Sequence, residues 1–357
     1  MNFDFADETP KLVMLLYGLV AFVVVVGGLL LLLDVVPNWF ARRRESRLIA
    51  VSAGGGAVAG GNPLARPRRP WRTEGLFGLF FLLPTVLLLL IGLVIPAIRT
   101  VALSFMDGGS DSWVGLQNYG WLFSQDEIVR VLVNTLIWVI LVPLLATTTG
   151  LLYAVLVDKA RFEAVAKSLI FLPMAISFVG AGIIWRFVYA YRGEGETQIG
   201  LLNQIVVWFG GVPRQWLQEP PLNTLLLIVI LIWIQAGFAM VVLSAAIKAI
   251  PGDIVEAARL DGVTPWQMFW QVTLPSIRPA LIVVVVTISI GTLKVFDIVR
   301  TATNGNFDTN VIASEMYNQA FRYGETGQGS ALAVFLFVLV IPIVIYQIRN
   351  LRKQREV

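Results

Sequence analysis

Seven long apolar stretches, separated by short polar loops, constrain this chain of 357 residues more than any other feature. A membrane core about 30 Å thick is crossed by a helix of about 20 apolar residues, and each stretch is long enough to cross it. The stretches cover residues 12–36, 75–103, 129–157, 168–190, 222–247, 279–298 and 329–348. We therefore expect an all-α polytopic membrane protein, because only helices or closed barrels satisfy the backbone inside lipid.

Composition supports this class and excludes several others. Hydrophobic residues make up 57% of the chain and charged residues only 14%, which is unlike a water-soluble domain. The chain has neither cysteine nor histidine, so it offers no disulfide, no thiol nucleophile, no histidine base and no histidine metal ligand. We expect no catalytic, metal or cofactor-binding residue on this chain. We also expect no nucleic-acid partner, because the basic residues gather in the loops between apolar stretches.

The first stretch is best interpreted as a retained membrane helix. A signal peptide is the competing interpretation, but the leader MNFDFADE is acidic and three arginines follow at 42–44, where a cleavage site would need small residues. Residues 50–65 are rich in Gly and Ala and suit a tether. We expect residues 1–72 to form an N-terminal transmembrane helix with a Gly-, Ala- and Arg-rich cytoplasmic linker, followed by a six-span domain over 73–357.

The charges of the loops predict the orientation. Arginines and lysines concentrate in alternate loops, including 66–72, 159–167 and 248–278, whereas the loops between them carry acidic residues such as Asp107, Asp126, Glu196 and Glu325. Basic loops stay in the cytoplasm. Seven spans with an external N-terminus and a cytoplasmic C-terminus satisfy this bias, and the protein is expected in a bacterial cytoplasmic (inner) membrane.

A polar island at residues 251–279 interrupts the apolar pattern, and it begins with a short helix. Asp253 is expected to N-cap this helix, with Glu256 completing a capping box three residues later. Gly262 is expected to end it. About eight residues span only about 12 Å, so the helix is too short to cross a membrane and must lie at its surface.

A second helix is expected to complete the island. Thr264 followed by Pro265 forms a helix start, because proline suits the first helical position. Leu274-Pro275 is expected to break this second helix.

The source of energy for transport separates two classes of function. The chain has no GxxxxGK[ST] phosphate loop, so it does not bind ATP by that route. A gradient-driven carrier usually places ionisable residues inside its spans, where they cost free energy and mark an ion path. The clearest such residues here are Asp34, Lys294 and Asp297. Either another subunit supplies the energy, or the chain is a secondary carrier of a small polar solute.

The island resembles the EAA-type motif of binding-protein-dependent ABC importer permeases. The resemblance covers about residues 73–357 and places the motif before the last two spans, as in that family. It is carried by Glu256-Ala257-Ala258, Asp261-Gly262 and Leu274-Pro275 with Pro279, by Leu172-Pro173, by Gly200-Leu201-Leu202-Asn203, and by Trp233 with Gly237-Phe238 and Met240. Residues 293–305, Glu315-Met316-Tyr317 and Gln319-Ala320-Phe321 most resemble the maltose and α-glucoside branch.

The resemblance implies that the island is a cytoplasmic coupling helix, which docks on a separate ATPase subunit. The residues implied in this contact are Asp253, Glu256, Ala257, Ala258, Asp261, Gly262, Leu274 and Pro275. Small alanines permit close approach of a partner, which agrees with such a role. The alternative interpretation is that Asp253 and Glu256 only cap a helix.

A substrate path is expected in the two spans that flank the island. Sugars are held by aromatic faces and a few polar groups, and the candidates are Trp233, Gln235, Lys294, Phe296 and Asp297. Lys294 and Asp297 are three residues apart and would share one face of a helix. They would pair, line a wet cavity or contact sugar hydroxyls, or else lie near the external interface and snorkel.

The sequence thus predicts the permease subunit of an ABC importer for an oligosaccharide of the α-glucoside class. The implied partners are an ATPase dimer that binds ATP and magnesium, a second homologous permease chain, an external sugar-binding protein, the sugar and membrane lipid. One departure from the family lies at residues 303–307, where TNGNF replaces the usual T-x-G-G-P. The rival prediction is a gradient-driven secondary carrier.

Overall fold

The computed structural model describes residues 82–158, 161–193 and 195–355. The chain divides into two units, Met1–Pro96 and Ala97–Val357. The predicted helix at 12–36 and the linker up to residue 72 lie outside the described residues. The helix Leu82–Leu103, which contains the π-helical turns η1 (Leu90–Val94) and ends with α3 (Ile95–Leu103), is apolar enough to span a membrane. It corresponds to the predicted span 75–103.

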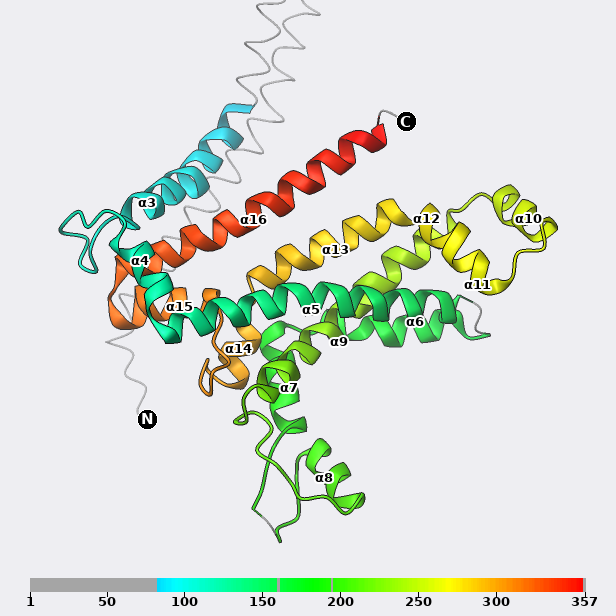
Figure 1. Cartoon of the computed structure of the whole chain (residues 1–357), viewed down its shortest axis with the longest axis horizontal. Helices are drawn as coiled ribbons and strands as arrows, with labels where there is room; N and C mark the ends of the chain where they lie inside the picture. Colours follow the sequence, from blue (N-terminus) through cyan, green and yellow to red (C-terminus); the bar gives the residue numbers. More distant parts are fainter. Residues whose placement is uncertain (1–81, 159–160, 194, 356–357) are drawn as a thin grey trace, which may run out of the picture. The chain divides into compact units, whose positions relative to one another are not determined.

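The second unit is built from helices, as predicted, and Figure 1 shows their arrangement. Short elements at the predicted external side are α4 (Gln117–Ser124), α8 (Leu201–Trp208), α14 (Asp297–Ala302), α15 (Ile312–Tyr317) and η4 (Asn318–Tyr323). The longer helices are α5 (Asp126–Val157), α6 (Glu163–Phe171), α7 (Phe178–Val188), α9 (Leu222–Lys248), α13 (Arg278–Leu293) and α16 (Thr326–Arg355). The described residues contain no β-strand, only an isolated bridge between Met106 and Trp113.

Helices α5 and α9 form the centre of this unit and pack against each other along much of their length. A small residue permits the close approach: a side chain at Gly150 of α5 would lie 2.4 Å from Ala239 Cβ and 2.9 Å from the Ala236 carbonyl of α9. Small residues at a helix interface allow such packing in membranes, where lipid gives no hydrophobic drive for association. Trp138 of α5 and Leu227 of α9 are fully buried in the same cluster.

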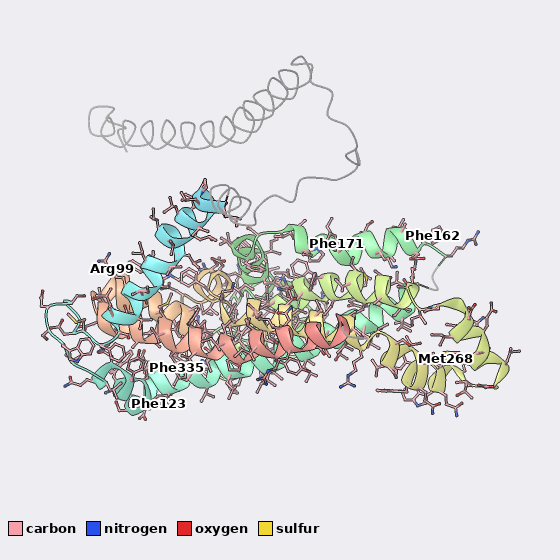
Figure 2. All side chains as sticks on the ribbon, turned by 90° about the horizontal axis from the view of Figure 1, so that it is seen from above. Arg99, Phe123, Phe162, Phe171, Met268 and Phe335 are labelled. Carbon is pink, nitrogen blue, oxygen red and sulfur yellow. The ribbon has the colours of Figure 1, made fainter. Side chains whose placement is uncertain are left out.

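A second, smaller cluster joins the start of α5 to α4, α15 and α16. Leu122, Val131, Ile312 and Leu332 are buried in it. Phe123 of α4 meets Phe335 of α16 edge-on, with ring centroids 5.8 Å apart, and Figure 2 shows the two side chains close together. This cluster fixes the last helix to the first part of the bundle.

Three of the remaining predicted spans are continuous helices, and the other two are bent helix pairs. Continuous helices of spanning length occur at Asp126–Val157, Leu222–Lys248 and Thr326–Asn350, and two further helix pairs qualify if each bent pair is one span. Together with Leu82–Leu103 this makes up to six spans in the described part of the chain, as expected for the core. The structure contains no membrane and leaves the total of seven a prediction.

The prediction of one span over 168–190 is wrong in detail. Helix Glu163–Ala175 and helix Phe178–Val188 meet at 102°. At about 1.5 Å per residue neither piece alone reaches across about 30 Å. Leu172-Pro173 lies in a 3₁₀ turn within this break. The second piece has its own N-cap, because the Ser177 side chain accepts a hydrogen bond from the Gly180 N–H at 3.0 Å.

The fifth core span also ends earlier than predicted. Helix α13 stops at Leu293, and Lys294 is its C-cap, with φ −99° and ψ 14°. A new short helix, α14, starts at Asp297. Lys294 and Asp297 therefore do not share one face of a continuous helix, and that prediction was wrong. The span was predicted to run on to residue 298 because Val295, Phe296 and Ile298 are apolar, although two charged residues lie among them.

Candidate functional site

The first candidate site is the polar island between α9 and α13. It contains α10 (Gly252–Leu260), then α11 (Pro265–Gln267), the π-helical turns η3 (Met268–Thr273) and α12 (Leu274–Ser276). In Figure 1 it projects at the far end of α9 and α13. Ala258 is the buried residue of α10, and α10 packs against η3. Asp253, Glu256, Ala257, Asp261, Gly262 and Pro275 are exposed, and Leu274 is half-buried.

The N-terminus of α10 differs from the prediction. Pro251 holds the N-cap position with φ −55° and ψ 133°, and no side chain caps the helix there. Asp253 lies within the first turn instead, and its capping box with Glu256 is absent. A proline with extended ψ at the N-cap starts the helix two residues earlier than an Asp253 cap would. Asp253 still places negative charge at the N-terminal end, where the helix dipole favours it.

The C-terminus of α10 confirms the role expected for Gly262. Gly262 has φ +77°, its N–H donates to the Arg259 carbonyl at 3.1 Å, and the Val263 N–H donates to the Ala258 carbonyl at 3.2 Å. These two bonds form a Schellman motif, which needs a left-handed residue at the position of Gly262. Gly262 therefore turns the chain from α10 towards the second island helix.

The second island helix starts as predicted and ends later. Thr264 is the N-cap with Pro265 at the first position, and its side chain forms a capping box with Gln267. Helical turns run on through the π-helical segment and past Leu274-Pro275 as far as Ser276, so Pro275 does not end the helix. The bend comes at Ile277, where the island helix meets α13 at 69°.

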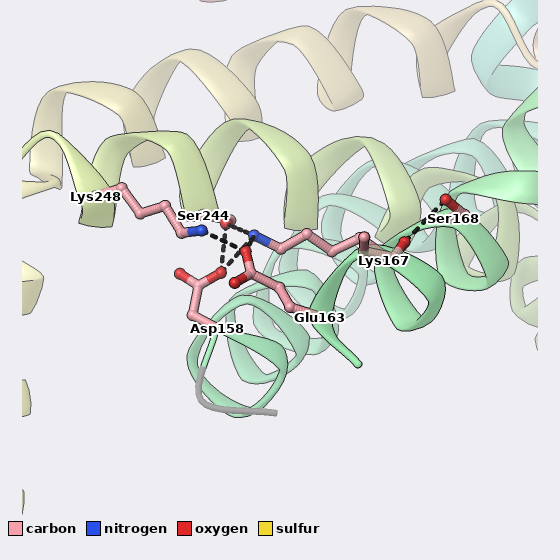
Figure 3. Close-up of polar contacts among 7 residues, drawn as sticks. Asp158, Glu163, Lys167, Ser168, Ser244 and Lys248 are labelled. Atoms are coloured by element: carbon pink, nitrogen blue, oxygen red, sulfur yellow. Dashed lines mark hydrogen bonds and ion pairs between the residues drawn. The ribbon is translucent and has the colours of Figure 1, made fainter. Parts of the chain in front are cut away.

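A cluster of charged side chains ties the base of the island to the rest of the bundle. Figure 3 shows Lys167 of α6 among Asp158, Glu163 and Ser244, which come from α5, α6 and α9. The Lys167 ammonium pairs with Asp158 and, at 2.7 Å, with Glu163 Oε1, and it donates to Ser244 Oγ. Ser244 Oγ donates to Asp158 Oδ1 at 2.7 Å, and Lys248 at the end of α9 pairs with Glu163.

Sequence reasoning used Lys167 and Lys248 only as orientation signals and missed this charge cluster. Its partners lie far apart in the chain, so no local pattern reveals the pairing. The Lys167 and Asp158 side chains are only 21% and 13% exposed. Lys248 lies three residues before Pro251, so the cluster fixes the helix end from which the island departs.

The loop over residues 190–221 is held by the Gly200–Asn203 segment. Asn203 is fully buried, and its side-chain amide donates to the carbonyls of Ala190 at 2.9 Å and Arg214 at 3.0 Å. Its Oδ1 accepts from the Arg214 N–H and from Trp216 Nε1. A side chain at Gly200 would lie 2.1 Å from the Ala190 carbonyl oxygen, which requires glycine. The G-x-x-N spacing thus closes this loop.

A second candidate site is a cavity of about 370 Å³ near the end of α13. It is lined by Lys294, Phe296, Ala313, Met316, Tyr317, Ala333 and Leu336. The rings of Phe296 and Tyr317 lie with centroids 5.4 Å apart. The Arg300 guanidinium lies over the Tyr317 ring, 5.1 Å from its centroid. The cavity thus combines two aromatic rings with one ammonium group.

The structure brings only two of the predicted substrate-path residues to this cavity, Lys294 and Phe296. Trp233 packs in the core against Trp185, with ring centroids 5.6 Å apart. Gln235 faces α13, where its Nε2 would lie 3.9 Å from a side chain at Gly291. Asp297 starts α14 and does not line the cavity. Met316 and Tyr317 were missed as lining residues.

A polar cleft of about 230 Å³ lies between the start of α5 and the loop that follows α14. Its lining residues are Glu127, Arg130, Val131, Asn134, Gly305, Asn306, Phe307, Asp308 and Asn310. Asn134 donates to the carbonyls of Asp308 and Asn310, at 2.6 and 3.0 Å, and Asn223 of α9 donates to the Phe307 carbonyl at 2.7 Å. The loop is therefore pinned to the starts of both central helices.

The same loop stores backbone strain. Asn304, Phe307 and Asp308 have φ values of +58°, +57° and +57°. A bulky residue such as Phe rarely adopts this region, and each such residue costs about 1–3 kcal/mol. Phe307 is 47% exposed, so the pinned loop presents an aromatic ring outward. This is the segment that departs from T-x-G-G-P, and its geometry is set by the pins from α5 and α9.

Comparisons with known proteins agree on one family. The family model described as binding-protein-dependent transport system inner membrane component matches residues 146–355. The osmoprotective compounds uptake permease protein of Synechocystis sp. is 50% identical over 276 residues, covering 77% of this chain and 99% of that protein. The alpha-glucoside transport system permease protein of Rhizobium meliloti is 43% identical over 346 residues, covering 96% of this chain and 98% of that protein.

A solved structure supports the same fold. A bacterial alginate ABC transporter, in complex with an alginate pentasaccharide-bound periplasmic protein, contains a chain that is 26% identical. The match covers 78% of this chain and 96% of that chain, with a TM-score of 0.67.

Proposed function

The chain belongs to the binding-protein-dependent transport system inner membrane components, and on that premise we propose that it conducts an oligosaccharide of the α-glucoside class into the cytoplasm. It is a permease of an ABC importer and a multi-pass protein of the inner membrane. The name of the Rhizobium meliloti relative supports the sugar class. The name of the Synechocystis relative, osmoprotective compounds, is compatible with small polar solutes of the same kind.

The exposed island helix α10 is the observation that carries the mechanism. Most of its residues are exposed, Ala258 alone is buried, and α10 packs against η3. An ATPase subunit docks there in this proposal, through Asp253, Glu256, Ala257, Asp261 and Gly262. Leu274 and Pro275 carry the movement through the second island helix to α13. ATP and magnesium bind to the ATPase, and this chain catalyses no reaction.

Alternating access requires further partners in this proposal. Sugar is delivered by an external binding protein, as the complex of the alginate transporter with a loaded periplasmic protein suggests by analogy. A second homologous permease chain completes the pathway, because one chain of this type forms one side of it. When the ATPase dimer closes, α10 moves, and the bundle opens outward to accept the sugar.

The cavity at the end of α13 is the proposed sugar contact. Aromatic rings bind the apolar face of a sugar ring, and Phe296 and Tyr317 supply two of them. Lys294 supplies hydrogen-bond donors to hydroxyl groups. Trp233 and Gln235 act from the core in this proposal, by fixing α9 against α7 and α13, and Asp297 acts by starting α14.

A reconstitution with a sugar panel tests the substrate class. The complete transporter is assembled in liposomes with its ATPase, partner permease and binding protein, and ATP hydrolysis is measured with α-linked and β-linked disaccharides. We expect α-glucosides to stimulate hydrolysis most. Phe296→Ala should lower uptake about two- to tenfold by removing an aromatic contact of about 0.5–1.5 kcal/mol, whereas Phe337→Ala, at an exposed position outside the cavity, should not. Equal stimulation by β-linked sugars would contradict the assignment.

A further inference from the structure

A buried carboxylate lies between the cavity and the polar cleft. Glu315 in α15 is only 4% exposed. Three side-chain amides donate to it: Asn310 to Oε2 at 2.6 Å, Asn318 to Oε2 at 3.2 Å and Gln319 to Oε1 at 2.6 Å. Burial of a charge costs free energy unless hydrogen bonds compensate it, and here amides, not a cation, do so within the described residues. Because burial of the Glu315 carboxylate costs free energy, its presence at this position indicates a role beyond packing.

One branch of this network reaches the wall of the cavity. Asn318 Oδ1 accepts a hydrogen bond from Arg300 Nη1 at 2.9 Å. Because the Asn318 oxygen is held by Arg300, its amide nitrogen is directed at Glu315. Arg300 in turn lies over the ring of Tyr317, which lines the cavity with Phe296. Glu315 thus fixes the orientation of Asn318. Asn318 in turn positions the Arg300 guanidinium, which lies over the Tyr317 ring.

The other branch reaches the polar cleft. Asn310 lines the cleft, and its carbonyl accepts from Asn134 of α5. Its side chain donates to Glu315. The start of α15 is held by α5 as well, because the Ile312 N–H donates to Thr135 Oγ1 at 3.0 Å. The pinned loop and the cavity wall are therefore joined through one carboxylate.

We propose that Glu315 is a positioning residue for sugar transfer, which couples the pinned loop at the polar cleft to the Arg300-Tyr317 wall of the cavity. This inference rests on the proposed function, and it adds a residue that contacts no sugar. A carboxylate suits the position because it accepts from three amide donors at once, whereas an amide would present a donor on one side. A displacement of the loop beside the polar cleft would then move the Tyr317 ring in the cavity wall.

The test measures sugar taken up per ATP hydrolysed, in the complete reconstituted transporter. Glu315→Leu leaves three amides without their acceptor, and we expect the ratio to fall about tenfold. Arg300→Met removes the cation from the ring at a partly exposed site, and we expect a fall of about threefold. Arg300→Lys keeps a cation and should restore most of the ratio. Ser314→Ala is the matched control, since Ser314 is fully buried on the same helix and its hydroxyl has no partner in the described structure.

The ratio separates positioning from general damage. A purely structural defect lowers ATP hydrolysis and uptake together and leaves the ratio unchanged, which would overturn the proposal. If the Glu315→Leu variant fails to assemble, the Arg300→Met and Arg300→Lys variants decide the test. The same ratio of sugar to ATP in both variants and in the unmodified protein would overturn the proposal. Failure of the unmodified protein to import any sugar would instead count against the proposed function.

Discussion

At the scale of single residues, Gly262 determines where the chain goes after α10. Its φ of +77° is open to glycine and costs other L-residues about 1–2 kcal/mol. A side chain there would meet no atom within 4 Å, so crowding plays no part in the requirement. The cost of replacement is therefore conformational, and it falls on the turn that aims the second island helix.

Gly262→Val should lower uptake at least about tenfold and reduce co-purification of the ATPase, because β-branched residues avoid left-handed backbone. Gly262→Asn should keep most of the activity, since asparagine tolerates that region. Membrane insertion should be unchanged in both. Uptake and ATPase binding are measured side by side, and a valine variant that matches the asparagine variant would refute the role of the turn.

Asn203 also determines the path of a loop, but through side-chain contacts, because four hydrogen bonds that it forms close the 190–221 loop. Asn203→Leu should leave buried donors and acceptors unpaired at about 1–3 kcal/mol each. We expect faster proteolytic cleavage of this loop and loss of the ATP hydrolysis stimulated by binding protein, with basal hydrolysis retained. Gln204→Leu, one residue along α8, is the control. Equal cleavage rates in both variants would show that Asn203 does not hold the loop.

At the scale of elements, the charge cluster at the base of the island links α5, α6 and α9. Lys167→Met keeps the length of the side chain but leaves the carboxylates of Asp158 and Glu163 without their ammonium partner. Removal of one partner from a mostly buried pair costs about 2 kcal/mol after allowance for its partial exposure. Lys248→Met is the comparison, because Lys248 is 52% exposed and an exposed pair contributes little.

We therefore expect Lys167→Met to lower the melting temperature of the purified protein and its uptake much more than Lys248→Met does. Thermal unfolding in detergent and uptake in liposomes are the two measurements. If Lys248→Met lowers the melting temperature and uptake as much as Lys167→Met, the solvent exposure of an ion pair does not determine its contribution here.

The predicted spans match the observed helices in some places and not in others. Apolar length predicted α5 and α9 closely, since 129–157 and 222–247 became Asp126–Val157 and Leu222–Lys248. It did not reveal the break at Leu172–Ala175, because the residues remain apolar through it. It also passed over the break after Leu293, because Lys294 and Asp297 lie there among apolar residues. Asp253 was misplaced as a cap because the proline before it competes for that position.

The candidate sites divide in the same way. Gly262 and Thr264 were predictable because helix ends depend on local residues. The cavity wall at Tyr317, the amide cage of Glu315 and the cluster around Lys167 depend on partners from separate helices. Only folding brings these together, so the sequence reached Lys294 and Phe296 but not the residues opposite them.

At the scale of the whole molecule, the island and the polar cleft, two candidate sites of the second unit, lie at opposite ends of the central helices. Asn134 and Asn223, near the starts of α5 and α9, hold the loop beside the polar cleft. Asp158 and Ser244, near the ends of the same helices, hold the base of the island. The two helices run in the same direction, and in the proposed mechanism a displacement at the island is carried along both to the cleft.

The central claim is that energy enters this protein at the island from a separate ATPase. The most direct measurement is sugar uptake by proteoliposomes that contain both permease chains and the binding protein, with and without the ATPase subunits and ATP. The account predicts uptake only when both are present, and its loss with Gly262→Val in the coupling turn. Uptake driven by an ion gradient without the ATPase would contradict it and would identify a secondary carrier.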